Sequence, residues 1–131
     1  MESVFQFSNP MLLKLDFALN DEFVGDGRTE IKVKLGIETR ISREEDNSAV
    51  VVLCVTVGGK SQEDPFSIYA EEGARFGWKE GAYEDEALDR LLKQNAPALL
   101  LSYLRPMIAN VTASSPYSAY DISFMNFKEE E

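Results

Sequence analysis

The sequence predicts an α+β fold, in which a four-stranded antiparallel sheet is followed by two helices packed on one face of that sheet. Three observations carry this prediction. The first part of the chain alternates apolar with polar residues or runs through β-branched residues, short turns separate these segments, and apolar residues recur at spacings of three and four only after residue 83. The length of 131 residues suits one domain over residues 1–131, with residues 1–11 and 128–131 as flexible ends.

The first two predicted strands have a period of two. In residues 12–19 one face carries Leu13, Leu15, Phe17 and Leu19. In residues 30–41 one face carries Ile31, Val33, Leu35, Ile37 and Ile41. The residues between them are mostly charged or polar, which predicts a sheet with one face in water. Because Asp26-Gly27 supplies turn chemistry between the two segments, we expect them to pair as neighbours.

The third and fourth predicted strands follow at once. Residues 49–57, AVVVLCVTV, are apolar at nearly every position and β-branched, which is typical of a central strand. The fourth strand begins at Phe66, and its alternation breaks at Gly73. Beyond that glycine, Phe76 and Trp78 with Gly77 and Gly81 nearby predict an irregular crossover that bears aromatic residues. Short turns between all four strands predict an antiparallel meander.

The second part of the chain predicts helices. Residues 83–95, YEDEALDRLLKQN, carry acidic residues in their first turn and predict a short helix that stops near Asn95. Asn95 is also a good N-cap, and with Pro97 in the first turn it predicts the start of a second, more apolar helix. Pro106 has no N–H and costs about 3 kcal/mol inside a helix, so we expect a bend there, not a stop.

Composition excludes several classes of function. The net charge of −10, from 23 acidic and 13 basic residues, argues against a nucleic-acid-binding surface. The chain has no histidine, which removes the commonest general base and zinc ligand. The single cysteine, Cys54, cannot form an internal disulfide or a multi-cysteine metal site and indicates a reducing compartment. Since the N-terminus also lacks the basic region of a signal peptide, we expect a cytoplasmic protein without a cofactor.

The acidic residues do not predict an enzyme. They cluster in turns such as REED and at a helix start, YEDE, where a solvated surface is their ordinary role. Asp21, Asp26 and Glu30 lack the spacing of a calcium loop, and no glycine-rich phosphate loop is present.

An ordered series of segments resembles the SecB-type export chaperones. The segments are SAVVVLCVTV, EEGARFGW, APALLLSYLRPMIANVT and ISFMNF, within a similarity that covers roughly residues 10 to 127. The resemblance implies an ATP-independent holdase that binds unfolded or precursor polypeptides in apolar surface grooves. It also implies a homotetramer, a dimer of dimers, with helices held between two sheets.

The resemblance also implies where a client binds. The positions that match the crossover, helix and tail of the family are Phe76, Trp78, Leu104, Met107, Ile108, Val111, Phe124, Met125 and Phe127. Aliphatic residues at helical spacing more often belong to a core or a subunit interface, so Phe76 and Trp78 are the better candidates.

Two departures from the family pattern bear on the partner. Tyr69 stands where the family has an acidic residue that helps to dock the motor ATPase of export, and the C-terminal tail shortens to KEEE. Docking to that motor therefore stays open, and the alternative is a SecB-like chaperone dedicated to a toxin–antitoxin pair. A further alternative is a non-catalytic module that binds a small molecule or one folded partner, and its small-molecule form predicts a monomer or dimer with a closed apolar pocket.

Overall fold

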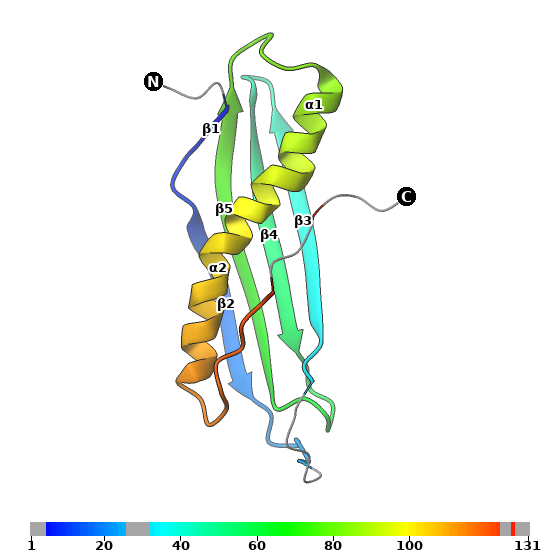
Figure 1. Cartoon of the computed structure of the whole chain (residues 1–131), viewed down its shortest axis with the longest axis vertical. Coiled ribbons are helices and arrows are strands. Elements are labelled where there is room, and N and C mark those ends of the chain that lie inside the picture. Colours follow the sequence, from blue (N-terminus) through cyan, green and yellow to red (C-terminus); the bar gives the residue numbers. More distant parts are fainter. Residues whose placement is uncertain (1–4, 26–31, 124–126, 128–131) are drawn as a thin grey trace.

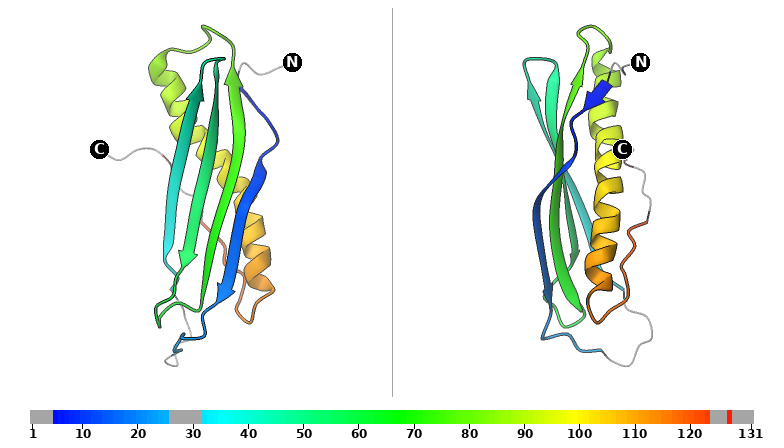
Figure 2. Two further views of the ribbon diagram at one scale, coloured as in Figure 1. Left: turned by 180° about the vertical axis from the view of Figure 1, so that it is seen from behind. Right: turned by 90° about the vertical axis from the view of Figure 1, so that its left-hand side faces the viewer.

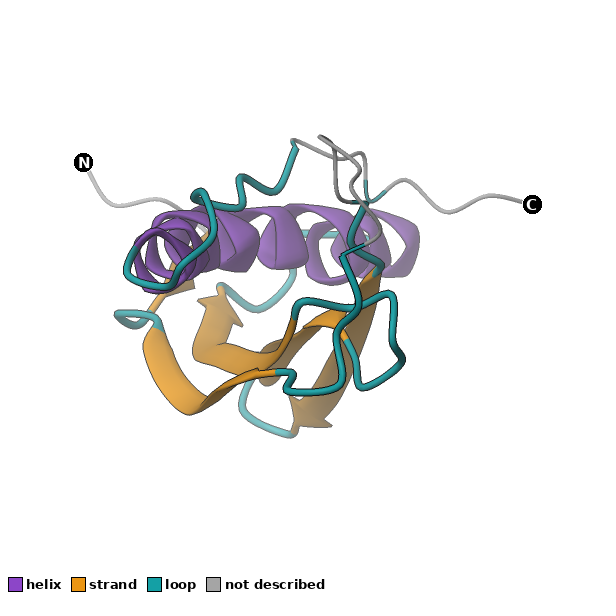
Figure 3. Cartoon of the chain, turned by 90° about the horizontal axis from the view of Figure 1, so that it is seen from below, coloured by secondary structure: helices purple, strands orange, loops and turns teal. Residues whose placement is uncertain are grey.

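The fold has two layers, a twisted antiparallel sheet and a long helix that runs diagonally across one face of it (Figures 1 and 2). The computed structural model describes residues 5–25, 32–123 and 127. The elements are β1 (Phe5–Phe7), β2 (Met11–Leu19), β3 (Leu35–Glu44), β4 (Ser48–Gly58), β5 (Phe66–Trp78), α1 (Asp85–Arg90), η1 (Leu91–Asn95) and α2 (Ala96–Ala113). The predicted α+β class, with helices on one face of an antiparallel sheet, is confirmed, and the view from below shows the two layers end-on (Figure 3).

The order of strands differs from the predicted meander. The sheet runs β1-β5-β4-β3, and β2 pairs with β5 along the same edge as β1. Phe5 lies opposite Trp78, and Leu19 lies opposite Phe66, so β1 and β2 together cover the length of β5. The expected pairing of the first strand with the second is wrong. Residues 20–34 form a connection long enough to cross the end of the sheet, which spans about 15 Å over three strand spacings.

Strand β4 is central, as its β-branched sequence predicts. It pairs with β3 on one side and with β5 on the other. Its odd-numbered residues face the helix layer and are fully buried, as in Val51, Leu53 and Val55. The apolar core therefore lies between this strand, β5 and the helix.

Strand β5 continues to Trp78, so the expected crossover after Gly73 is also wrong. Gly73 stays within the strand because β2 packs over it at a β-bulge between Leu12 and Lys14. A Cβ atom on Gly73 would lie 2.9 Å from Leu13 Cδ1 and 3.2 Å from a methyl group of Val52. The glycine is explained by this close approach and not by a break in the strand.

The helix is continuous from α1 through η1 to α2, where the sequence predicts two helices. Asn95 has helical backbone angles (φ −74°, ψ −43°) and makes no capping hydrogen bond. Instead, the N–H of Ala96 donates to the carbonyl of Leu91, a π-helical bond. Pro97 has no N–H to give to the helix, and the wider turn before it accommodates that loss. The helix does not stop at Pro106, which lies inside α2.

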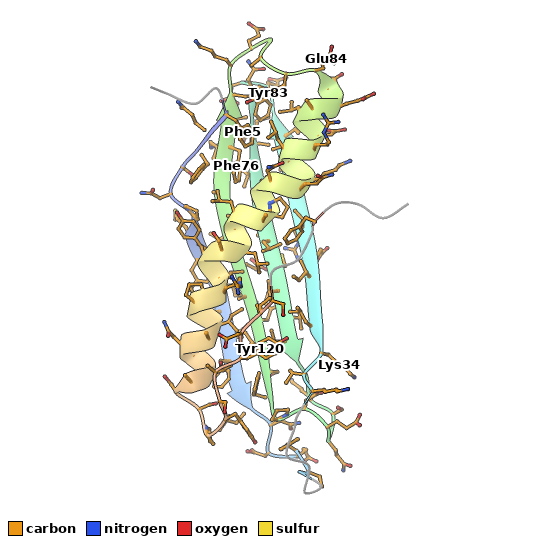
Figure 4. The ribbon with its side chains drawn as sticks, in the orientation of Figure 1. Phe5, Lys34, Phe76, Tyr83, Glu84 and Tyr120 are labelled. Carbon is orange, nitrogen blue, oxygen red and sulfur yellow. The ribbon has the colours of Figure 1, made fainter. Side chains whose placement is uncertain are left out.

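A C-terminal segment after α2 lies along the helix over the sheet (Figure 1). The N–H of Tyr120 donates to Thr112 Oγ1 over 2.7 Å, and Arg105 Nε donates to the carbonyl of Ile122 over 2.6 Å. Ile122 is 1% exposed and joins the core. Figure 4 shows Tyr120 beside the lower half of α2.

Candidate functional site

The residues expected to bind a client do not form one surface. Phe76, Leu104 and Ile108 are at most 1% exposed, because β5 and α2 direct them into the core. In this conformation they offer no surface to a client. The half-buried members of the set are Trp78, Met107, Val111 and Phe127. Phe124 and Met125 lie outside the described residues.

Phe76 and Trp78 belong to an aromatic cluster at one end of the sheet. Phe5 of β1 stacks on Phe76 with ring centroids 5.6 Å apart and on Trp78 at 6.4 Å. Tyr83, which precedes α1, meets Phe5 edge-on at 6.2 Å (Figure 4). Trp78 therefore has a regular packing partner, which the predicted crossover did not provide.

Exposed apolar side chains gather on the side of the helix that the C-terminal segment leaves open. Phe7 and Leu12 lie opposite Phe76 and Glu72 of β5, hence on the helix-facing side of the sheet, and are 46% and 41% exposed. Tyr103 of α2 is 44% exposed. Tyr103 is two residues from Arg105, so it points about 200° around the helix from the residue that holds the C-terminal segment. We call Phe7, Leu12 and Tyr103 the apolar strip.

The edge strand is apolar on its other face as well. Met11 and Leu13 are 62% and 52% exposed and lie on the face of the sheet away from the helix. Among the described residues, β2 pairs only with β5, so its outer backbone groups have no strand partner. The sequence signal for this surface was the run Met11-Leu12-Leu13, where alternation fails, together with Phe5 and Phe7 in a stretch expected to be a flexible end.

A second apolar surface lies where the C-terminal segment meets the sheet. An open hollow of about 360 Å³ is lined by Val33, Pro65, Phe66, Pro116, Tyr117, Ser118, Ala119 and Tyr120. The Tyr117 ring lies 6.0 Å from the rings of both Phe66 and Phe23. Burial raises the pKa of Tyr120, so its phenol stays neutral. The hollow has room for an apolar side chain of an extended segment, although it is not a closed pocket.

The face away from the helix carries a polar cluster. The hydroxyl of Tyr69 donates to the Glu71 carboxylate over 2.5 Å, and Arg40 Nη1 lies 3.7 Å from the same oxygen. The hydrogen bond to Glu71 raises the pKa of Tyr69, because it favours the neutral phenol. Glu71 is thus already paired with Tyr69 and Arg40. It does not supply a free acidic group in place of the one that the family pattern has at the position of Tyr69.

Within residues 5–25, 32–123 and 127, no group of three or more Cys, Asp or Glu side chains could hold a metal ion. In the same ranges, no helix is long and apolar enough to cross a membrane.

The chain was compared with protein families, with curated proteins and with solved structures. The family model described as "Preprotein translocase subunit SecB" matches residues 14–129. An uncharacterized protein of Methanocaldococcus jannaschii is 26% identical over 115 residues, which cover 84% of this chain and 71% of that protein.

Two solved structures share the fold. One is a Mycobacterium tuberculosis SecB-like chaperone in complex with a ChAD peptide from the HigA1 antitoxin, with a TM-score of 0.75 at 16% identity over 92% of this chain and 90% of that one. The other is a protein of unknown function from Streptococcus agalactiae, with a TM-score of 0.50 at 10% identity over 92% and 97% of the two chains.

Proposed function

Because the chain belongs to the SecB family, we propose that it is an ATP-independent chaperone, a holdase that binds unfolded or precursor polypeptides through exposed apolar surface. The observation that carries the proposal is the apolar strip. Phe7, Leu12 and Tyr103 are each more than 40% exposed, although residues of their kind are usually buried in a core. Exposed apolar surface of this sort marks an interaction site.

The character of this surface favours an extended, non-catalytic partner. Within the part of the chain that the structure describes, the outer edge of β2 is unpaired, and an extended polypeptide can add to such an edge by main-chain hydrogen bonds while its side chains contact the strip. The net charge of −10 keeps the protein soluble and attracts basic unfolded segments. Trp78 and Met107 are half-buried members of the expected client-binding set, and binding through apolar contacts needs no covalent step.

We further propose that the protein works as a homotetramer, a dimer of dimers, in the cytoplasm. An apolar edge strand is a liability for a single chain, and natural proteins cover or charge such edges. Met11 and Leu13, on the face away from the helix, are therefore assigned to contact between copies. The strip on the helix side is assigned to the client.

Two classes of client are candidates: the antitoxin of a toxin–antitoxin pair, and precursor polypeptides for export. The M. tuberculosis chaperone of the same fold holds an antitoxin peptide, which supports a chaperone dedicated to a toxin–antitoxin pair. An export role through the motor ATPase is less well supported, since Tyr69 replaces an acidic docking residue and is bonded to Glu71. A small-molecule module is disfavoured, because the hollows that the structure describes, of about 300–360 Å³, are open.

The test is suppression of aggregation of an unfolded, reduced client at stoichiometric ratio, with the mass of the chaperone measured in the same buffer. The native protein should suppress aggregation, and the double variant Phe7→Ser/Leu12→Ser should lose most of this effect because it removes exposed apolar surface. The matched control is Val24→Ser, which removes an apolar side chain that is 59% exposed but lies away from the strip.

Two outcomes would overturn the proposal. One is a native protein that never suppresses aggregation. The other is a double variant that keeps full activity at unchanged mass, which would place the client elsewhere. If the double variant loses activity and its assembly also has a lower mass, the strip is a contact between subunits and not the client surface.

A further inference from the structure

Strand β5 carries a buried carboxyl group in the core layer. Glu72 is 3% exposed, and its side chain points to the helix-facing side of the sheet, because its register partners are Leu53 of β4 and Leu12 of β2. Its Oε1 atom is fully buried and has no hydrogen-bond partner among the described residues. A buried polar oxygen without a partner is costly in a native fold and needs an explanation.

Among the described residues, no basic side chain faces Glu72 from the strands beside it. The helix-facing residues of β1, β2 and β4 are apolar, and the nearest helix-facing positions on β5 itself are Ala70 and Ala74. Lys14, Asp16, Cys54 and Glu71 all lie on the opposite face.

The helix that covers this part of β5 adds little charge. In α2, which packs across β4 and β5, the only titratable side chains are Tyr103 and Arg105. Tyr103 is largely exposed, and Arg105 Nε is engaged by the carbonyl of Ile122 in the C-terminal segment.

We propose that Glu72 is a pH-sensitive switch in the contact between the helix and the sheet. With its proton, the carboxyl is tolerated in the apolar layer and α2 lies closed on β5. When the proton passes to solvent, the carboxylate must be hydrated, which loosens α2 from the sheet next to Leu12 and widens the apolar surface there. The loosening rests on the fold alone, whereas its effect on clients rests on the proposed function.

The direction of the pH dependence follows from burial. Desolvation raises the pKa of Glu72 above the usual 4.5 in the folded chain. Below that usual value the carboxyl is protonated in both states, and its full contribution to stability is present. As pH rises through the higher folded-state pKa, the unfolded chain has already released the proton, so this contribution is lost.

The first experiment is a pH titration of the full-length native protein by carbon NMR of the glutamate side-chain carboxyls. We expect Glu72 to titrate well above the exposed glutamates. If Glu72 titrates at the same pH as the exposed glutamates in the assembled protein, a basic group of another subunit neutralises its carboxylate and the proposal is wrong. This measurement needs no variant.

The second experiment compares thermal unfolding between pH 5 and pH 8 for native protein, Glu72→Gln, Glu72→Leu and the control Glu71→Gln. The control changes the adjacent glutamate, on the opposite face. Native protein and Glu71→Gln should lose several degrees more in Tm across this range than either Glu72 variant. Equal pH dependence in native protein and Glu72→Gln would overturn the switch.

Client binding is then read separately. If the switch serves the chaperone, aggregation suppression should rise with pH in native protein and stay flat in Glu72→Gln. A protein with the expected Glu72 titration but no suppression at any pH would refute the proposed function and leave the switch standing.

Discussion

The two edges of the sheet are built in opposite ways. The edge formed by β2 begins with Met11, Leu12 and Leu13, which are between 41% and 62% exposed. The edge formed by β3 carries Glu38, Arg40, Arg43 and Glu44. Charged residues on an edge strand discourage pairing with another chain. Their absence at Met11, Leu12 and Leu13 favours an edge that another chain covers.

The charged edge is also tied down locally. Arg43 Nη2 lies 2.5 Å from Asp89 of α1, and Arg75 of β5 forms an ion pair with Glu44. Beside Met11, Leu12 and Leu13, the described ion pair is that of Lys14 with Asp16 at 3.8 Å, which lies within β2 and ties the strand to no other element. The difference indicates that the charged edge at β3 disfavours pairing with another chain, whereas the apolar edge at β2 allows it.

The largest expected effect comes from charging the apolar edge. Leu13→Lys should raise the dissociation constant of the proposed assembly by about 30- to 150-fold, because it removes roughly 2–3 kcal/mol of apolar burial from the contact. Multi-angle light scattering over a concentration series measures this. The matched control, Ser42→Lys on the β3 edge, should leave the mass unchanged. If both variants assemble normally, the comparison of the edges does not describe subunit contacts.

Trp78→Ala should come next. Removal of this half-buried ring from its stack on Phe5 should cost about 2–3 kcal/mol of unfolding free energy, read from urea denaturation. It should also weaken client binding without dissociating the oligomer. Loss of the oligomer instead would place Trp78 in the subunit contact.

Gly73→Ala should have a smaller effect, of about 1–2 kcal/mol on stability, because the new methyl group meets Leu13 at the β-bulge. Gly77→Ala in the same strand is the control, since its Cβ atom would meet only the carbonyl of Asn47, at 3.8 Å. Equal destabilisation by the two variants would show that the bulge does not depend on Gly73.

The smallest effect should come from the charged edge. Arg43→Ala should change the free energy of unfolding by less than about 1 kcal/mol, because both partners of its ion pair with Asp89 are about half exposed. A double-mutant cycle with Asp89→Ala isolates the pair. A coupling above about 2 kcal/mol would mean that this edge is held by its charges and not only protected by them.

Periodicity predicted the faces of the strands but not their neighbours, and it was wrong at Leu13, which the β-bulge turns to the face opposite Leu15 and Phe17. The alternation at Leu15 and Phe17 indicates which side of β2 is apolar. It does not distinguish pairing of β2 with β3 from pairing with β5. The residues between β2 and β3 are numerous enough to permit either pairing. The β-branched run of β4 identified a central strand because a strand paired on both sides shields apolar residues even on its outer face, where Val50 and Val52 are partly buried.

The sequence singled out Gly73, Asn95 and Pro97 as special positions of the backbone, but the structure that was predicted at each of them was wrong. Gly73 suggested the end of a strand, whereas a neighbouring strand needs its space. Asn95 and Pro97 suggested a helix start, whereas they mark a π turn within one helix. The inward series Phe66, Ile68, Ala70, Glu72, Ala74 and Phe76 was visible in the sequence, and Glu72 within it was the available signal for a buried acid. The exposed strip could not be predicted, because exposure depends on where the helix crosses the sheet.

The π turn before Pro97 has a consequence for the phase of the helix. Its buried side chains recur every four residues, at Leu88, Leu92, Ala96, Leu100, Leu104, Ile108 and Thr112. Four residues of α-helix turn about 40° beyond a full circle, so this series would drift by about 240° along a uniform helix. The wider turn at residues 91–95 takes back part of that drift, and the diagonal path over the twisted sheet absorbs part of the rest. Deleting one residue from this turn would rotate Leu88 and Leu92 away from the sheet by about 100° relative to the buried side of α2.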